Sequence, residues 1–210
     1  MKCILLIISC EKYKHNAQTQ KQTWLQHIPN YYHLMGSKSI CGKKRYVIDE
    51  DNKIIYTNTE DDYLSLPAKV ITAFLAIYEN KQVDYIFKTD DNQMLIRPNF
   101  FKILMNTLNN NKHNICYGGN ALHLKQHECM LHTTHPEFPR GVMLGGCTYC
   151  TGPFYLLHMS AVENLLYKFP DIYNSLVEDH SMGYYLDEKY RNKLLILDTP
   201  NIFNELRATR

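Results

Sequence analysis

The stretch YIFKTDDNQML, residues 85–95, decides the fold and raises the first question about chemistry. An apolar run with the length of a buried strand ends directly on Asp90, Asp91 and Asn92. Two adjacent carboxylates repel each other, and their burial costs free energy of hydration. A metal ion or basic side chains must offset this cost. A polar loop after a strand gives the same pattern without any ligand. The residues elsewhere in the chain decide between a ligand site and a simple polar loop.

Strand-like and helix-like patterns alternate on both sides of this segment. We expect strands at 3–9, 31–36, 44–48, 53–57, 83–88, 114–119 and 193–197. We expect helices at 16–28, 65–80, 98–108, 158–169 and 182–192. The alternation predicts an α/β sandwich with a central, mostly parallel sheet flanked by helices. In such sheets ligands bind beyond the carboxyl ends of the strands, where Asp90 and Asp91 would lie.

Local signals refine two helix starts and one loop. Ser65, followed by Pro67 in the first turn, predicts the N-terminus of the helix that ends near residue 80. Ser160 and Glu163 have the spacing of a capping box. Residues 120–141 show no period and are rich in histidine, so we expect a long surface loop. We hypothesise that this loop is an acceptor wall or lid.

Composition excludes several classes of protein. The formal net charge is only +2 and the basic residues are scattered, so nucleic acid is not an expected partner. The apolar start at 3–10 is too short to cross a bilayer and no cleavage site follows it. We therefore expect no membrane span in this chain, and a soluble, cytoplasmic protein. Seven cysteines without framework spacing also favour a reducing compartment.

Four blocks of sequence occur in an order that is shared with one family. The blocks are QKQTW (20–24), DDYLSLPAKV (61–70), YIFKTDDNQML (85–95), and YCTGPFYLL (149–157) paired with VEDHSMG (177–183). They are similar to Ile-Arg-x-Thr-Trp, Asp-Ser-Tyr-x-Asn-Leu-Thr-x-Lys-Thr, Lys-x-Asp-Asp-Asp, Tyr-Cys-Ser-Gly-x-x-Tyr and Glu-Asp-Val-Tyr-x-Gly. With these blocks the chain resembles the beta-1,3-galactosyltransferase and Fringe-like glycosyltransferases over nearly its whole length.

This resemblance implies a GT-A-type nucleotide-sugar-binding fold and a single catalytic domain over 1–210. Residues 1–119 would form the nucleotide-sugar-binding half, and 120–210 the acceptor-binding and catalytic half. The implied enzyme is an inverting hexosyltransferase that moves galactose, N-acetylglucosamine or glucose from a UDP-sugar to a hydroxyl of a glycan or glycoprotein, forming a beta-1,3-type linkage. Relatives usually work in the secretory pathway behind a membrane anchor, which leaves that location as an alternative.

The resemblance also implies a metal and donor site at Asp90, Asp91 and Asn92. A divalent cation stabilises the charge that develops on a leaving diphosphate, and hard carboxylate oxygens suit Mn²⁺ or Mg²⁺. The chain departs from the family at Asn92, where a third aspartate is usual and the amide offers only a neutral oxygen. No histidine follows His180, although a histidine near the C-terminus ligates the metal in some family members.

Asp179 is the position at which the resemblance places the general base. An acceptor alcohol needs a base because its protonated oxygen is a poor nucleophile. An acidic residue in the first turn of a helix would be explained equally by the helix dipole. The resemblance implies donor-binding roles for Lys21, Asp61, Lys69, Lys88, Asp90 and Asp91. It implies acceptor-binding roles for Tyr149, Gly152 and Glu178. Glu178 is also the alternative candidate for the general base.

Aromatic residues and cysteines leave other interpretations open. Trp24 and Tyr63 would stack on uracil or a sugar, or else pack in the core. A zinc-binding structural or interaction module is a second hypothesis, because Cys147 and Cys150 have the two-residue gap of zinc sites. Its further ligands would be His127, Cys129 and His132. A catalytically degenerate sugar-binding protein on the same fold is the third.

Overall fold

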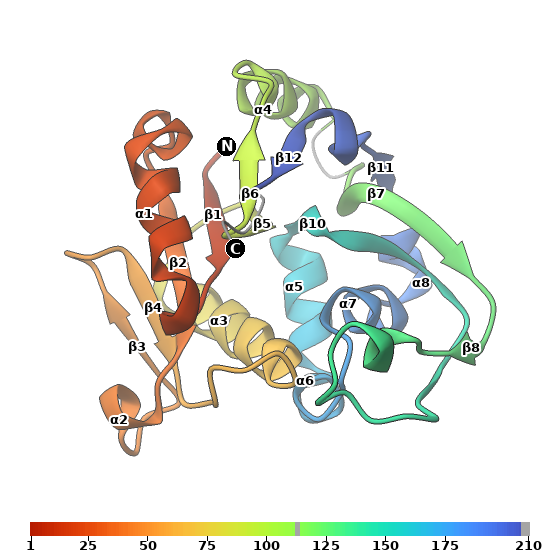
Figure 1. Cartoon of the computed structure of the whole chain (residues 1–210). Coiled ribbons are helices and arrows are strands. Elements are labelled where there is room, and N and C mark those ends of the chain that lie inside the picture. The colour runs from red at the N-terminus through yellow and green to blue at the C-terminus, as the bar shows by residue number, and fades with distance from the viewer. Residues whose placement is uncertain (112–113, 207–210) are drawn as a thin grey trace.

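A central eight-stranded sheet organises the computed structural model, which describes residues 1–111 and 114–206 (Figure 1). The strand order is β11-β7-β10-β5-β1-β2-β4-β3. Only β10 and β3 run against the other strands, so the prediction of a mostly parallel sheet is confirmed. The bounds are β1 Cys3–Ile8, β2 Tyr31–Gly36, β3 Tyr46–Asp49, β4 Ile54–Thr57, β5 Tyr85–Asp90, β7 Tyr117–Leu124, β10 Cys147–His158 and β11 Leu194–Ile196.

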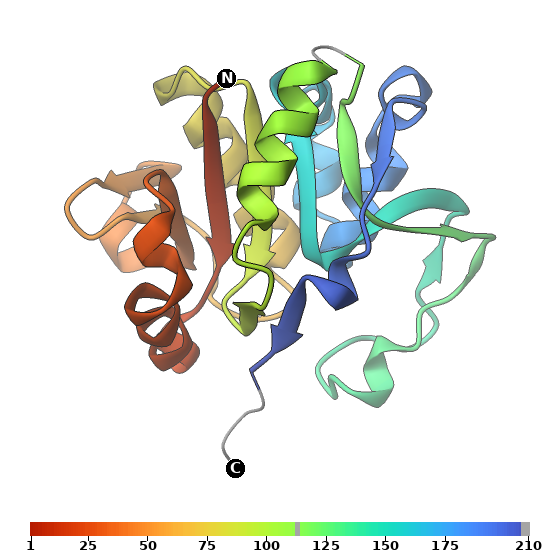
Figure 2. The same ribbon diagram turned by 90° about the horizontal axis from the view of Figure 1, so that it is seen from above.

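Helices cover both faces of this sheet (Figure 2). α3, α5, α6 and α7 pack on one face, and α4 packs on the other with the 3-10 turn Trp24–His27. The central strand β1 is therefore buried on both sides: Ile4 and Leu6 join the first cluster, and Leu5 and Ile7 the second. The bounds are α1 Lys14–Gln22, α2 Lys38–Cys41, α3 Leu66–Asn80, α4 Phe100–Asn110, α5 Met159–Leu166, α6 Phe169–Tyr173, α7 Glu178–Tyr185 and α8 Glu188–Arg191.

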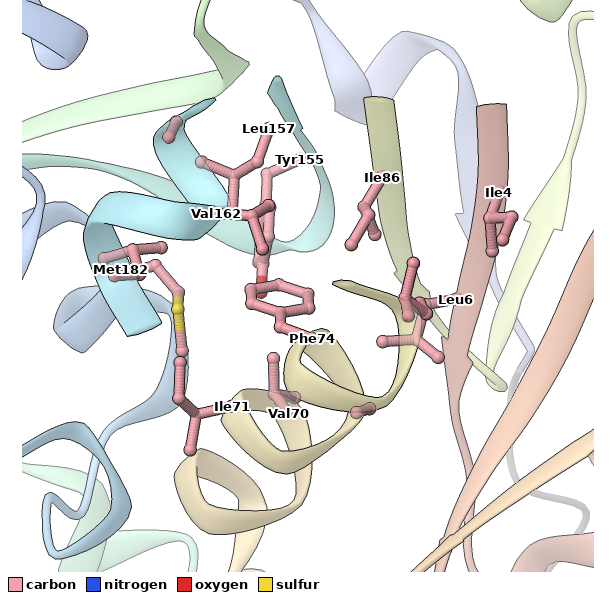
Figure 3. Packing of buried hydrophobic residues seen from close by; sticks show 14 of the residues in the cluster. Ile4, Leu6, Val70, Ile71, Phe74, Ile86, Tyr155, Leu157, Val162 and Met182 are labelled. Carbon is pink, nitrogen blue, oxygen red and sulfur yellow. The ribbon is translucent and has the colours of Figure 1, made fainter. Parts of the chain in front are cut away.

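The central helix α3 confirms the period read from its sequence. Val70 and Phe74 point from it toward the sheet and α5, and Ile71 points toward Met182 of α7 (Figure 3). Pro67 lies in the first turn as expected, and Ser65 occupies the N-cap position. The Ser65 side chain makes no capping hydrogen bond, so that part of the prediction is wrong.

Three helix predictions need correction. The helix expected at 16–28 ends at Gln22, where Thr23 Oγ1 donates to the Thr19 carbonyl and the chain turns into the 3-10 segment. The capping box at Ser160 is wrong, because His158 is the N-cap and its Nδ1 accepts from the Ser160 amide. The last helix begins earlier than expected, at the start of α7, and is interrupted before α8.

The long loop expected at 120–141 is only partly a loop. β7 continues to Leu124 because β10 pairs with it as far as Cys147, beyond a register shift between Cys150 and Tyr155. The two strands extend away from the sheet and carry a small hairpin of β8 His127–Glu128 and β9 Met143–Leu144 (Figure 1). Partner strands decided this extension, and the sequence of the segment alone gave no period to reveal it.

A second small sheet joins the C-terminus to the strand end that opened the sequence analysis. β12 Phe203–Glu205 pairs antiparallel with β6 Gln93–Leu95. Phe203 is buried in the second hydrophobic cluster, so this contact fixes the final described segment beside residues 90–92. Among the described residues no helix is long and apolar enough to cross a membrane.

The packing of Phe74 gives a test of this fold. We expect Phe74→Ala to lower the free energy of unfolding by about 3–5 kcal/mol, because the ring is fully buried at the centre of α3. Urea denaturation, monitored by circular dichroism, measures the change in the free energy of unfolding. Tyr78→Ala is the matched control on the same helix: its ring is 44% exposed, so the cost should stay below about 1 kcal/mol. Equal costs for the two variants would contradict the packing of α3.

Candidate active site

A pocket of about 440 Å³ lies at the carboxyl ends of β1 and β5. Because these two strands are parallel neighbours, their last residues meet at one edge of the sheet. The start of α3, the turn after β1 and a distant segment of the β7–β10 extension complete the wall. The lining residues are Ile8, Ser9, Cys10, Lys12, Tyr13, Asp61, Asp62, Tyr63, Leu66, Lys69, Asp90, Asp91, Asn92, His135 and Glu137.

Asp91 is the most buried carboxylate of this pocket, at 8% exposure. Its Oδ2 accepts from Ser9 Oγ at 2.8 Å, and its Oδ1 lies 3.5 Å from the donor Asn16 Nδ2. Burial, which outweighs these two hydrogen bonds, raises the pKa of Asp91 from 3.8 to about 6. Burial therefore disfavours the charged form of Asp91 more than Ser9, Asn16 and the nearby Lys69 ammonium favour it.

Asn92 is tied to the C-terminal strand. Its Nδ2 donates to Glu205 Oε1 at 2.8 Å, and its Oδ1 accepts from Gln93 Nε2 at 3.0 Å. The Leu206 amide also donates to the Asn92 carbonyl at 2.6 Å. The amide side chain is thus engaged by protein groups on both ends, and β12 braces the loop that carries Asp90 and Asp91.

Asp90 and Asp91 are the residues of this pocket that could hold a divalent cation together with a phosphate ligand. Asp90 and Asp91 both line the pocket, and ions such as Mg²⁺ are commonly held by one or two carboxylates plus substrate phosphates and water. Within residues 1–111 and 114–206, no group of three or more His, Cys, Asp or Glu side chains could hold an ion by itself. A cation at this edge would therefore depend on oxygens of its ligand.

Lys88 is buried at the back of the site, with 1% of its surface exposed. Its Nζ donates to Asp90 Oδ1 at 2.7 Å and to the Gly152 carbonyl at 2.7 Å, and lies 3.2 Å from Glu178 Oε2. Burial opposes the ammonium charge, but the carboxylates of Asp90 and Glu178 raise the pKa of Lys88 above its usual value. One cation thereby joins β5, β10 and α7.

Glu178 completes this buried cluster. The Tyr155 hydroxyl donates to Glu178 Oε1, so both carboxylate oxygens have partners. Burial raises the pKa of Glu178 from 4.5 to about 7, with the Lys88 ammonium acting in the opposite direction. Glu178 and the phenol of Tyr155 are therefore interior groups that hold Lys88 in place.

Asp179, the next residue, is partly buried and lies at the N-terminus of α7. Its Oδ2 accepts from the Gly152 amide at 2.9 Å, and its Oδ1 accepts from the His180 amide at 2.8 Å. Burial raises the pKa of Asp179 above 3.8. A Cβ placed on Gly152 would lie 3.6 Å from Asp179 Oδ2, 3.6 Å from Lys88 Nζ and 3.7 Å from Asp90 Oδ2. The three charged groups therefore meet around one glycine.

Comparison with known proteins places this geometry in a family. The sequence profile of the family described as Galactosyltransferase matches residues 16–191. The chain belongs to the galactosyltransferase family. It is accordingly a glycosyltransferase, and the resemblance read from the four sequence blocks is confirmed. No curated protein matches the chain.

Two solved structures are similar to this galactosyltransferase-family chain. It is similar to a glycosyltransferase involved in the glycosylation of the major capsid of PBCV-1, with 13% identity, a TM-score of 0.55, and coverage of 100% of this chain and 95% of that chain. It is also similar to a cytidylyltransferase from Leptospira borgpetersenii, with 16% identity, a TM-score of 0.48, and coverage of 94% and 76%. The first similarity supports the GT-A-type fold that we expected.

Some of the lysines expected to bind the donor are engaged elsewhere in this family member. Lys88 faces the buried cluster, and Lys21 donates to the Asn52 carbonyl at 3.2 Å beside a separate, smaller pocket. Lys69, only 1% exposed, donates to Asp61 Oδ1 at 2.7 Å and to the Ser9 carbonyl at 2.8 Å. Asp61 also accepts from the Gly36 and Glu11 amides, both at 2.8 Å. Asp61 and Lys69 therefore hold the pocket wall together while lining it.

Of the two aromatic residues singled out in the sequence, Trp24 lies in the core and Tyr63 lines the pocket. Trp24 stacks on Phe101 and lies in the second hydrophobic cluster, as its core interpretation required. Tyr63 lines the pocket, but one face of its ring is covered by His135, with centroids 3.7 Å apart. Tyr149 packs against His180 near Asp179, at a centroid distance of 5.5 Å.

The zinc interpretation finds no support. Cys147 and Cys150 both lie in β10, where residues three apart point to opposite faces of the strand. They and His127, Cys129 and His132 belong to the described residues, in which no group of three or more His, Cys, Asp or Glu side chains that could hold a metal ion is formed. A two-residue cysteine gap needs a turn to bring both thiols to one ion, and here the backbone is extended.

Sequence reasoning missed several residues of the pocket. Lys12 and Tyr13 lie in the turn directly after β1, and His135 and Glu137 come from the β7–β10 extension. Lys12 has no ion-pair partner in the part of the chain that the structure describes, and its Nζ lies 5.1 Å from the centroid of the Tyr13 ring. The position of Lys12 after a buried strand was a usable signal. His135 and Glu137 lie in the segment 120–141 that we hypothesised to be an acceptor wall or lid, but its sequence did not show which of its residues reach the pocket.

The buried cluster predicts an unusual pH dependence of stability. Because the pKa of Glu178 is raised from 4.5 to about 7 in the folded protein, its stabilising contribution is complete below pH 4.5 and is lost as the pH rises through 7. Gln does not titrate, so the stability of Glu178→Gln should not fall with the wild type over this window. We expect the difference in free energy of unfolding, variant minus wild type, to rise by at most about 3 kcal/mol between pH 4.5 and pH 7. Urea denaturation between pH 4.5 and pH 8 measures the difference.

The control for this prediction is Lys88→Met. It leaves Asp90 and Glu178 buried without their cation, so it should destabilise the protein on the alkaline side by about 3–5 kcal/mol. A constant difference between Glu178→Gln and wild type at every pH would show that Glu178 does not titrate in this window.

Proposed function

We propose that this family member transfers a hexose from a UDP-sugar to a hydroxyl of a glycan or glycoprotein, with inversion and a beta-1,3-type linkage. One observation carries the proposal: around Gly152, the carboxylate of Asp179 lies beside the Lys88–Asp90 pair that borders the pocket. A base next to a donor-phosphate site is the arrangement that inverting transfer requires. The family assignment supports glycosyl transfer, while the sugar and linkage belong to the proposal.

Asp179 is the base in this mechanism. The acceptor hydroxyl gives its proton to a free lone pair of the Asp179 carboxylate as its oxygen attacks the anomeric carbon of the donor. The bond from that carbon to the phosphate oxygen breaks, and its electron pair leaves with UDP. The amides of Gly152 and His180 orient the carboxylate, and its raised pKa makes it a better proton acceptor.

Asp90 and Asp91 would hold a Mn²⁺ or Mg²⁺ ion, which neutralises the negative charge on the leaving diphosphate when it is bound. The residues of the chain contribute the rest. Lys12, which forms no ion pair with a described residue, would offer its ammonium at the pocket wall to phosphate oxygens. Tyr13, whose ring is 42% exposed, would stack on the uracil of UDP. In this proposal the acceptor reaches Asp179 past Tyr149, which packs on His180, and past the Gly152 backbone, which donates to Asp179.

Binding of UDP tests the donor site. We expect UDP to bind wild-type protein in the presence of Mn²⁺, and Asp91→Ala to lose most of this metal-dependent binding, because a buried carboxylate is removed from the ion. Isothermal titration calorimetry with and without Mn²⁺ measures both. Asp187→Ala, a substitution in the turn before α8, is the control and should bind like wild type. Metal-independent binding of equal strength would contradict the cation site.

Loss of the base tests the catalytic step. We expect Asp179→Asn to reduce kcat by about 100- to 10,000-fold while UDP affinity is retained, since general bases contribute factors of this size. The asparagine oxygen can still accept the hydrogen bond from the Gly152 amide, whereas the His180 amide loses its carboxylate acceptor. A transfer assay with UDP-hexose donors and glycan acceptors measures the rate. Full activity in this variant would remove Asp179 from the mechanism.

A further inference from the structure

A shallow groove of about 590 Å³ runs along β3, the last strand of the sheet. β3 pairs with β4 on one side, and no other described strand pairs with its outer edge (Figure 1). The groove is lined by residues 43–45, by the first three residues of β3, and by Glu79 and Asn80 at the end of α3. It is separate from the candidate active site, with which it shares no lining residue.

The outer edge of β3 presents backbone groups that β4 does not use. The Asn58 amide donates to the Arg45 carbonyl at 2.9 Å, so Arg45 belongs to a hydrogen-bonded pair of the β3–β4 ladder. Such pairs alternate along antiparallel strands, and the amide and carbonyl of Val47 therefore also face β4. Those of Tyr46 and Ile48 point the other way, along the groove. An edge of this kind is a template for one more strand.

Positive charge gathers at one end of the groove. Lys43, Lys44 and Arg45 are consecutive in the chain, and all three side chains are exposed. Arg45 Nη2 lies 3.7 Å from Glu79 Oε1, whereas Lys43 and Lys44 form no ion pair with any residue that the structure describes. Two ammonium groups without a counter-charge therefore lie beside the edge of the strand.

The turn before β3 and the end of α3 hold this surface in place. Gly42 follows α2 with a φ of 57°, a left-handed conformation that glycine adopts without strain. Its carbonyl accepts from Asn58 Nδ2 at 3.1 Å. The Tyr46 hydroxyl donates to Glu79, which ties β3 to the last turn of α3. The strand edge and the three basic residues therefore form one surface with a fixed geometry.

We propose that the outer edge of β3 binds an extended, acidic polypeptide segment as an additional strand. The inference goes beyond the proposed function, because it concerns a protein partner and not the sugar donor. Main-chain hydrogen bonds to Tyr46 and Ile48 supply the pairing, and acidic side chains of the partner meet Lys43 and Lys44. A second copy of this chain would bring the same positive charges to the groove, so an acidic partner is the better match.

Binding of a fluorescein-labelled peptide, in which Glu alternates with Val and Thr, tests the proposal by fluorescence anisotropy. We expect the double variant Lys43→Glu, Lys44→Glu to bind it at least about tenfold more weakly than wild type, because two attractive charges become repulsive. Both side chains are exposed, so the substitutions leave the fold intact. The matched control is Lys102→Glu, Lys189→Glu, which changes the net charge equally at exposed positions of α4 and α8 and should bind like wild type.

Hydrogen exchange measured by NMR separates strand addition from a contact between charges alone. We expect the amides of Tyr46 and Ile48 to gain protection when the peptide binds, because they become hydrogen-bonded. The amide of Val47 already faces β4 and should show no such gain. A version of the peptide with proline at alternate positions cannot donate to the edge, so it should bind at least about tenfold more weakly.

Each contrary outcome overturns the inference. Wild-type protein that does not bind the peptide, or equal affinities of wild type and Lys43→Glu, Lys44→Glu, would remove the site. An equal loss in the control variant would show an effect of net charge only, and binding without protection of Tyr46 and Ile48 would exclude strand addition. Protection of these amides without peptide, together with a dimer in analytical ultracentrifugation, would assign the edge to a second copy. UDP binding is measured separately, so each of these results leaves the proposed function standing.

Discussion

The buried ammonium of Lys88 is the interaction on which the site depends. A lysine with 1% exposure is tolerated only where acceptors replace its hydration, and here Asp90, Glu178 and the Gly152 carbonyl do so. These three acceptors belong to three elements of the fold: β5, α7 and β10. Because all three acceptors must reach the Lys88 ammonium, the distance between the end of β5 and α7, the helix that carries Asp179, is fixed.

The antiparallel strand β10 makes this meeting possible. It lies between β5 and β7, pairing Tyr155 with Lys88 and Phe154 with Thr89. The register shift between Cys150 and Tyr155 lies in the stretch that contains Gly152, whose amide binds Asp179 and whose carbonyl binds Lys88. Bulged strands commonly re-aim groups beside active sites. In this chain the groups that the bulge directs toward the site are the backbone amide and carbonyl of Gly152. The sequence at this position therefore needs only a small residue, which leaves room for the side chains around it.

Much of the fold was predictable because its signals are local. The apolar runs of β1, β2 and β5 and the one-sided period of α3 were each identified within a short distance of their observed bounds. The errors occurred where partners outside the segment decided the outcome. β7 extends to Leu124 because β10 pairs with it, and Ser160 caps nothing because His158 occupies the N-cap position. Local propensity is silent about partners of this kind.

The sequence by itself determined that two carboxylates end a buried strand, because residue order fixes this feature. The helix that begins on Glu178 and Asp179 was expected only from residue 182. The sequence also determined the family, through blocks whose spacing needs no coordinates. Only the tertiary structure decided which charges face each other. It directed Lys88 inward, tied Asn92 to Glu205, and brought His135 and Glu137 to a pocket whose other walls lie before residue 93. These contacts join residues far apart in the chain, and burial and strand pairing in three dimensions select them.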